Sequence, residues 1–170
     1  MKQTKLLLPG LLAIMFLFIF QSLSAQTIKM KIPSISGLPA DGEDLIAFEV
    51  SDTQYVAGTA GGGGGAGKTV FEMAKVKKLM SASTNELWKR SLQGTHIAEV
   101  QFDFYNNSNN IFYKIVLKEV TVNHFSFLSP ECNNCPRLFH QVWFDYDKIE
   151  VTDIATGSTV KWDRSGNVIY

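Results

Sequence analysis

Residues 111–127, which read IFYKIVLKEVTVNHFSF, decide the fold class of this chain. Side chains that alternate between two faces are typical of a β-strand, and this alternation runs unusually far. Ile97–Tyr105 and Leu138–Val151 show the same period on either side, and Asn106–Asn110 forms a turn cluster. One face of the central strand would hold Ile111, Tyr113, Ile115, Leu117 and Glu119, and the other Phe112, Lys114, Val116, Lys118 and Val120.

Shorter extended segments surround these three strands. They are Thr27–Ile32, Leu45–Val50 with a continuation to Val56, Thr159–Trp162 and Val168–Tyr170. Many strands, hairpin-like connections and little helix predict a mainly β fold, a compact two-sheet β-barrel or sandwich. The 170 residues suit one domain, which we place at residues 26–170.

One short α-helix is predicted in this β-rich chain. Ser83–Glu86 has the S-x-x-E spacing of a capping box, Leu87–Leu92 carries an apolar stripe, and Gly94 is a natural stop. These signals predict a helix of about ten residues. Residues 70–80, just before it, fit both a strand and part of a helix, so their periodicity leaves that choice open.

The first 25 residues are typical of a secretory signal peptide. Lys2 and Lys5 precede an apolar stretch, Leu6–Phe20, and small residues follow it. We expect cleavage between Ala25 and Gln26, and a retained N-terminal anchor is the alternative. Cleavage would leave 14 basic and 16 acidic side chains, in a weakly acidic protein exported to the periplasm or the medium. Because nucleic-acid binding requires a basic surface, we expect no nucleic-acid partner.

Residues 57–67 hold seven of the 13 glycines of the chain. Gly62–Thr69 satisfies G-x-x-x-x-G-K-[ST], the pattern of the phosphate-binding loop, in which Lys68 would meet the terminal phosphates. Such a loop joins a parallel strand to a helix in an α/β protein, whereas this fold is predicted to be mainly β. We therefore expect no nucleotide and no other cofactor. A glycine loop without function is a further interpretation.

A glycine run that ends in Ala-Gly-Lys and leads directly into a strand resembles the haemolysin-coregulated protein (Hcp) family, which forms the tube of bacterial type VI secretion systems. Further motifs follow in the order of the family. These motifs are Ile32–Gly37, Leu45–Ser51, Gly61–Lys68 with Phe71, Val76–Lys78, Ser83–Thr84, Gly94–Ile97, Tyr113–Val122 and Phe144–Val151. The resemblance implies that Val70–Lys78 is a strand.

The resemblance also implies an assembly. Subunits of the family pair edge to edge into a six-membered ring, and rings stack into a hollow tube. The extended loop at residues 57–68 would reach the next subunit or ring. Its assembly residues would be Gly61, Gly62, Gly63, Gly64, Gly65, Gly67 and Lys68.

The predicted signal peptide sets this chain apart, because the tube proteins of the family are cytoplasmic. We expect an exported structural protein that forms hexameric rings, which stack into a tube or carry small partners. The alternative is a monomeric secreted binding module that keeps the fold without the ring.

Cys132 and Cys135 lie in a predicted loop between two strands. In an oxidising compartment they would form a disulfide that shapes one turn. A redox pair, a metal site and free thiols are the alternatives.

No pattern in the chain predicts an enzyme. The spacing of His96, His124 and His140 suits neither a metal nor a catalytic triad, and no serine lies in a G-x-S-x-G elbow. We expect these histidines to be structural or exposed. The three tryptophans, Trp88, Trp143 and Trp162, are expected to anchor the core or an interface.

Overall fold

The computed structural model describes residues 26–35, 38–54, 69–129 and 138–170. No helix in these ranges is long and apolar enough to cross a membrane. The elements in chain order are β1 (Thr27–Lys31), β2 (Glu43–Asp44), β3 (Ala47–Glu49), β4 (Asp52–Gln54), β5 (Thr69–Phe71), β6 (Ala74–Leu79), α2 (Ser83–Gln93), β7 (Ile97–Tyr105), β8 (Ile111–Leu128), β9 (Phe139–Asp153), β10 (Thr159–Asp163) and β11 (Val168–Ile169).

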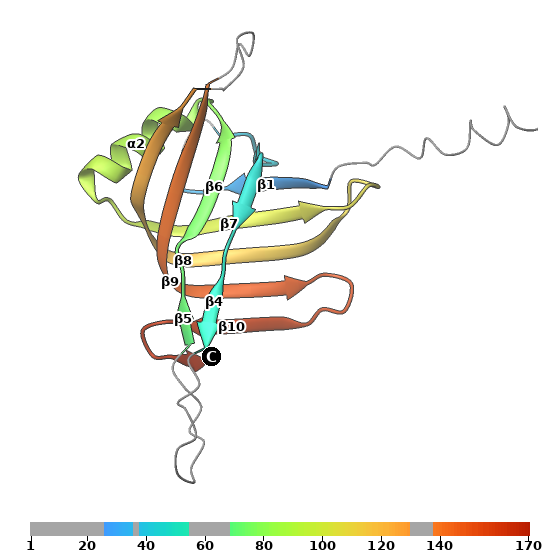
Figure 1. Cartoon of the computed structure of the whole chain (residues 1–170). Coiled ribbons are helices and arrows are strands. Elements are labelled where there is room, and N and C mark those ends of the chain that lie inside the picture. The colour runs from blue at the N-terminus through green and yellow to red at the C-terminus, as the bar shows by residue number, and fades with distance from the viewer. Residues whose placement is uncertain (1–25, 36–37, 55–68, 130–137) are drawn as a thin grey trace, which may run out of the picture.

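Two antiparallel layers share the long strands β8 and β9. One layer has the order β11-β10-β9-β8-β7-β1-β2, and in the other β3 pairs with β6 and β6 with β9. β9 pairs with β10 through Lys148–Thr152 and with β6 through Phe139–Phe144, so its two halves lie in different layers. Figure 1 shows β8 and β9 bending from one layer into the other. The mainly β prediction is confirmed, as a sandwich that does not close into a barrel within the described residues.

The bend in the shared strands lies at Glu119. Strict alternation predicted Val120 on the face opposite Leu117, and this was wrong, because both side chains are buried in the core. Glu119 has a left-handed backbone with φ of 54°. On the neighbouring β9, Tyr146 and Ile149 are buried with the same spacing of three residues. Strands that turn a corner in this way present both of their halves to one core.

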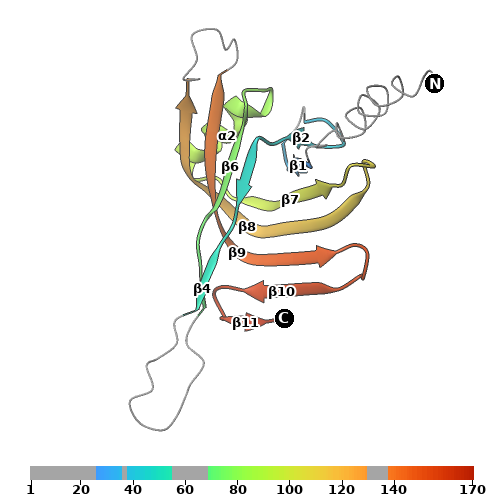
Figure 2. The ribbon, with the colours of Figure 1, turned by 45° about the vertical axis from the view of Figure 1, so that its right-hand side comes forward.

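The core lies between the layers and includes one side chain of α2. Phe102 of β7 contacts Phe48 of β3, with ring centroids 4.4 Å apart, and lies 6.5 Å from Phe144 of β9. Phe102, Phe144 and Leu87 of α2 are fully buried. Each such side chain stabilises the fold by roughly 1.5–3 kcal/mol. Figure 2 shows α2 behind the layer that contains β6.

The helix begins where it was predicted, but its first turn is held differently. Ala82 is the N-cap and supplies no capping side chain. The Ser81 amide instead donates to Thr84 Oγ1 at 2.9 Å. Ser83, the predicted cap, lies inside the helix, and Glu86 pairs with an arginine one turn later. The capping box was therefore wrong, while the left-handed Gly94 (φ 61°) ends the helix as expected.

The segments around the glycine run are strands. The family resemblance implied a strand at residues 70–78, and the structure has extended chain there as two strands, β5 and β6, interrupted at Glu72 and Met73. The predicted strand Leu45–Val50 with its continuation is divided into short pieces. The pieces are β3 and β4, and they are separate because β3 pairs with β6 in the sandwich, whereas β4 pairs with β5 in a two-stranded sheet of its own.

Candidate assembly surfaces

A two-stranded hairpin extends away from the sandwich, and we call it the hairpin arm. It consists of β4 and β5, which pair only with each other among the described strands. All three residues of β4 are exposed, and Figures 1 and 2 show the arm pointing away from α2. The predicted assembly residues Gly61–Gly65, Gly67 and Lys68 connect its strands in sequence and lie outside the described residues. Lys68 leads into an antiparallel strand, whereas a phosphate-binding loop leads into a helix.

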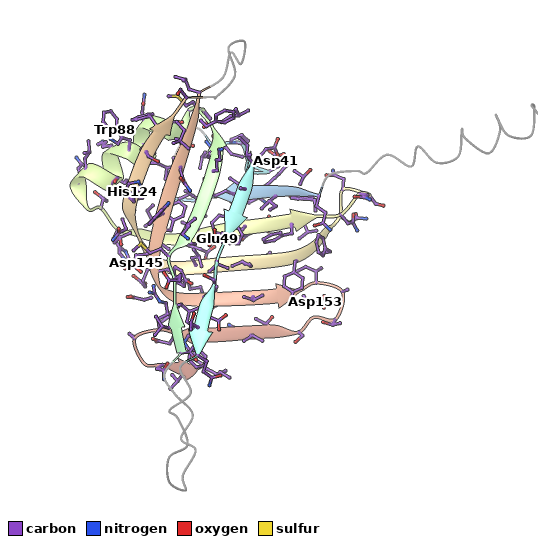
Figure 3. The ribbon with its side chains drawn as sticks, viewed as in Figure 1. Asp41, Glu49, Trp88, His124, Asp145 and Asp153 are labelled. Carbon is purple, nitrogen blue, oxygen red and sulfur yellow. The ribbon has the colours of Figure 1, made fainter. Side chains whose placement is uncertain are left out.

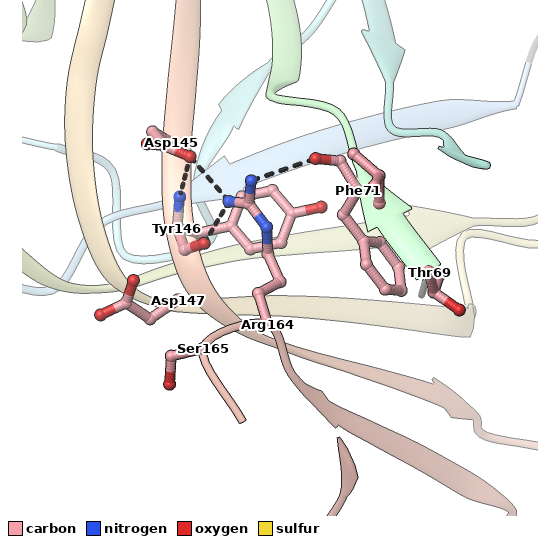
Figure 4. A pocket seen from close by; sticks show the side chains of 8 residues that line it. Thr69, Phe71, Asp145, Tyr146, Asp147, Arg164 and Ser165 are labelled. Carbon is pink, nitrogen blue, oxygen red and sulfur yellow. Dashed lines mark hydrogen bonds and ion pairs between the residues drawn. The ribbon is translucent and has the colours of Figure 1, made fainter. Parts of the chain in front are cut away.

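Arg164 connects the base of the arm to the sandwich (Figure 4). Its Nη2 donates to Phe71 O at 3.0 Å, and its Nη1 donates to Asp145 Oδ1 at 2.6 Å and to Tyr146 O. The guanidinium also lies 4.6 Å from the centre of the Tyr146 ring. A cavity of about 270 Å³ opens between the arm and these residues. No sequence pattern singled out Arg164, which lies in a turn before β11.

Tyr146 lies beneath this arginine and is 2% exposed. Burial raises the pKa of its hydroxyl to about 12, although the nearby Arg164 opposes the shift. Tyr146 Oη has no hydrogen-bond partner among the described residues. Tyr146 is therefore a neutral core residue that supports the guanidinium with its ring.

The sandwich presents open edges with exposed apolar side chains. β11 is the outer strand of its layer, and its Val168 and Ile169 are 51% and 71% exposed. On the other layer, β3 pairs on one side only, and Ile46 beside it is 50% exposed. An unpaired edge with apolar side chains is a template for pairing with another strand.

A second exposed apolar surface lies along α2. Trp88, labelled in Figure 3, packs edge-on against Phe127 with ring centroids 5.3 Å apart. Trp88 is 42% exposed and Leu92 is 72% exposed, so the predicted apolar stripe is only partly used by the core. Trp162 packs against Phe71 at the base of the arm.

A buried polar network joins β2, β6 and α2. Lys78 Nζ lies 2.8 Å from Glu43 Oε2 and donates to Ser81 Oγ at 2.6 Å and to Ser83 Oγ at 3.1 Å. Burial lowers the pKa of Lys78, and the Glu43 carboxylate partly offsets this effect. Burial also disfavours ionised Glu43, but hydrogen bonds from Lys78 and neighbouring serines hold its pKa below the usual value. The Glu43 carboxylate thus opposes the loss of the Lys78 proton, and the network links β2, β6 and the first turn of α2.

This network was not predicted from the sequence, although the pattern of β6 contains a signal for it. Lys78 follows Ala74 and Val76 at spacings of two, so it lies on the face of β6 that enters the core. His140 of β9 completes the site, because its Nδ1 lies 3.2 Å from Thr84 Oγ1. Burial, followed by the charge of Lys78, lowers the pKa of His140 to about 4, so this histidine is neutral at pH 7.

The other predicted site residues are scattered. His96 lies at the surface 3.3 Å from Glu119, and His124 is exposed beside Trp143, whose ring centre lies 5.1 Å away. Gln26 is exposed just before β1, while Ala25 lies outside the described residues. Cys132 and Cys135 also lie outside them. Among the residues that are described, no cluster of His, Cys, Asp and Glu suits a metal ion.

Comparisons with solved structures identify relatives of this fold. "Structure of a type six secretion system protein" superimposes with a TM-score of 0.75 at 15% identity, covering 86% of this chain and 100% of that one. Hcp1 from Salmonella typhimurium gives a TM-score of 0.71 at 16% identity, covering 86% and 99%. The baseplate of the anti-feeding prophage, solved by cryo-EM with six-fold symmetrisation, gives 0.54 at 13% identity, covering 76% and 93%.

A search of curated protein sequences found no significant match. The family model described as "Type VI secretion system effector, Hcp" matches residues 41–152, about two thirds of the chain. This match spans β2 to β9 and therefore includes the hairpin arm, α2 and both shared strands. Together with the superpositions, it shows that the chain belongs to the Hcp family of type VI secretion systems and carries the fold of its tube proteins.

Proposed function

We propose that this protein is an exported structural subunit that assembles into hexameric rings. The observation that carries the proposal is the hairpin arm, which projects from the sandwich and pairs with no other described strand. An isolated two-stranded hairpin is only marginally stable in water, so an arm of this kind gains stability when a neighbouring subunit contacts it. The glycine run that follows β4 in sequence carries a large entropic cost of ordering, and contacts between subunits would offset that cost.

The ring size is supported by symmetry and by the open edges. The baseplate relative was analysed with six-fold symmetry. Among the described strands, β11 and β3 are open edges of different layers, and joining unlike surfaces of identical copies generates a closed ring when the rotation closes. Stacking of rings into a tube, and the carrying of small secreted proteins inside them, extend the same proposal.

Native mass spectrometry and light scattering of residues 26–170 test the ring. We expect a discrete species of six times the subunit mass, and electron microscopy should show closed rings. A monomer that persists at high protein concentration would contradict the proposal and favour a secreted binding module with the same fold. Co-purification of small secreted proteins with the ring, but not with dissociated subunits, would test the carrier role.

We also propose that residues 1–25 are a signal peptide cleaved between Ala25 and Gln26. The test is N-terminal sequencing of the protein recovered outside the cytoplasm after expression of all 170 residues. A mature protein that begins at Gln26 is the expected result, and an intact N-terminus in the membrane fraction would contradict it.

The exported protein is also expected to contain a Cys132–Cys135 disulfide. The measurement is the intact mass before and after reduction, combined with thiol alkylation. Alkylation of both cysteines without a reductant would contradict the disulfide.

A further inference from the structure

The direction of the hairpin arm depends on very few contacts. Its strands pair with each other, and Asp52, Thr53 and Gln54 lie opposite Phe71, Val70 and Thr69. Across the described residues, one side-chain hydrogen bond joins the arm to the rest of the protein, and its donor is Arg164. A two-stranded hairpin is only marginally stable alone, so the arm depends on the contacts at its base. These are the Arg164 bond, the Glu72 N to Ser51 O hydrogen bond and the packing of Phe71 on Trp162.

Arg164 is itself held firmly on the sandwich. Its backbone amide donates to Asp147 O at 2.8 Å, and its side chain bonds Asp145 and Tyr146 O while lying over the Tyr146 ring. Charge-assisted hydrogen bonds of this kind are about twice as strong as neutral ones. The planar guanidinium binds three acceptors at once, on β5 and on β9, which the amine of a lysine cannot do in the same geometry.

A cavity lies beside this arginine, so the packing of the arm on the sandwich there is limited to the base, where Phe71 contacts Trp162. The arm contributes Thr69, Val70 and Phe71 to the cavity wall, and the sandwich contributes Asp145 and Asp147. Since the arm and the sandwich are separated by open space there, the arm can swing when the bond to Phe71 O is lost. Figure 4 shows the guanidinium bridging the two sides.

We propose that Arg164 is a positioning residue for assembly, which fixes the direction of the hairpin arm so that the arm meets the neighbouring subunit. The inference rests on the proposed role of the arm in the ring. Arg164, in a turn near the C-terminus, would therefore control a subunit contact made by β4 and β5, which lie about a hundred positions earlier in the chain.

The test compares Arg164→Lys with Arg90→Lys. Arg90 is a matched control, because it too bonds one carboxylate, Glu86, and two backbone carbonyls, Ser34 O and His96 O, but far from the arm. Amide hydrogen exchange is measured at a dilution at which each protein is monomeric. We expect Arg164→Lys to accelerate exchange in β4 and β5 about tenfold or more, with no change in β7 and β8. Arg90→Lys should leave the arm unchanged.

Assembly is then followed by light scattering over a range of concentrations. The Arg164→Lys protein should need about tenfold more protein than the wild type to form rings, while Arg90→Lys should match the wild type at equal subunit stability. Equal arm exchange in the two variants would overturn the inference. Faster arm exchange with unchanged assembly would also overturn it.

Two unfavourable outcomes, a variant that does not fold and a wild type that does not assemble, can still be interpreted. If Arg164→Lys does not fold, Asp145→Asn removes the charged partner at a half-exposed position and should give a weaker effect of the same pattern. If the wild type never assembles, the proposed ring fails, whereas the exchange comparison still decides whether Arg164 holds the arm.

Discussion

The side chain of Lys78 is 1% exposed, which is rare for a lysine. Its ammonium group is accommodated because Glu43 supplies the opposite charge, and Ser81 Oγ and Ser83 Oγ accept hydrogen bonds from its N–H groups. Removal of two charges from water costs several kcal/mol per ion, so the pair adds little net stability. Its effect is on geometry, since it joins the short strand β2, the end of β6 and the first turn of α2.

Removal of one member of this pair should be severe. Glu43→Gln leaves the buried ammonium of Lys78 without a counter-charge and should lower the free energy of unfolding by about 3–5 kcal/mol. Glu49→Gln is the matched control, because Glu49 pairs with Lys75 at 3.1 Å but is 61% exposed. That change should cost at most about 1 kcal/mol. Urea denaturation of both variants measures the difference, and equal losses would show that Lys78 does not need Glu43.

Acid should destabilise the protein through His140. Burial, together with the charge of Lys78, lowers the pKa of His140 to about 4, while ionised Glu43 opposes that shift. The unfolded chain therefore binds a proton before the folded one, and stability falls as the pH falls from about 6.5 to about 4. The loss from this group is about 3 kcal/mol.

Urea denaturation across this pH range measures the slope. The pKa of Glu43 is lowered in the folded protein, so its contribution to the free energy of unfolding is also lost as the pH falls, at the acid end of the range. His140→Gln should flatten the slope above pH 5, whereas His96→Gln, at an exposed position, should leave it unchanged. A slope that persists in His140→Gln would assign the effect to other groups.

At the scale of elements, periodicity predicted where strands lie but not how they meet. The bounds of β7 were predicted fully and those of β8 and β9 nearly so, because each alternates over many residues. The corner at Glu119 escaped prediction, since a left-handed glutamate carries no signal in the pattern of polar and apolar residues. The capping box at Ser83 failed because tertiary contacts with Glu43 and Lys78 use its hydroxyl.

The candidate assembly surfaces were harder to predict than the elements. The glycine run indicated an extended segment, but the contact at the base of the neighbouring arm is made by Arg164, a residue of an ordinary turn. Contacts between segments so far apart in sequence, such as Arg164 with Phe71, leave no local pattern. The resemblance to a family supplied the strand at residues 70–78, which periodicity alone did not decide.

The end of α2 offers a direct test at this scale. Gly94 has φ of 61°, and a Cβ atom added there would meet nothing within 4 Å. Gly94→Ala should therefore cost about 1 kcal/mol through backbone strain alone, and Gly94→Asn should cost less because asparagine tolerates this conformation better. Thermal denaturation compares the two variants. An alanine variant as stable as the wild type would show that the helix end adjusts freely.

For the whole molecule, the central question is how a chain with a predicted signal peptide uses the fold of a tube protein. A sandwich with open edges must either blunt them or pair them, and this chain leaves apolar side chains on β11. The edges therefore favour self-association wherever the protein resides. Assembly after export would require no cytoplasmic machine, because the arm and the edges belong to the subunit itself.

Variants of two exposed apolar residues can distinguish edge-to-edge pairing from nonspecific hydrophobic association. Ile169 on the edge strand β11 and Leu92 on α2 are 71% and 72% exposed, so a lysine at either position has almost the same access to water. Lysine on an edge strand opposes pairing with another strand. If rings form edge to edge, Ile169→Lys should raise the protein concentration needed for assembly, and Leu92→Lys should leave it unchanged. Neither change should alter the unfolding free energy by more than about 0.5 kcal/mol, because both sites are on the surface. Light scattering over a dilution series provides the measurement. Loss of assembly in Leu92→Lys alone would instead place the subunit contact on the surface formed by α2, Trp88 and Phe127.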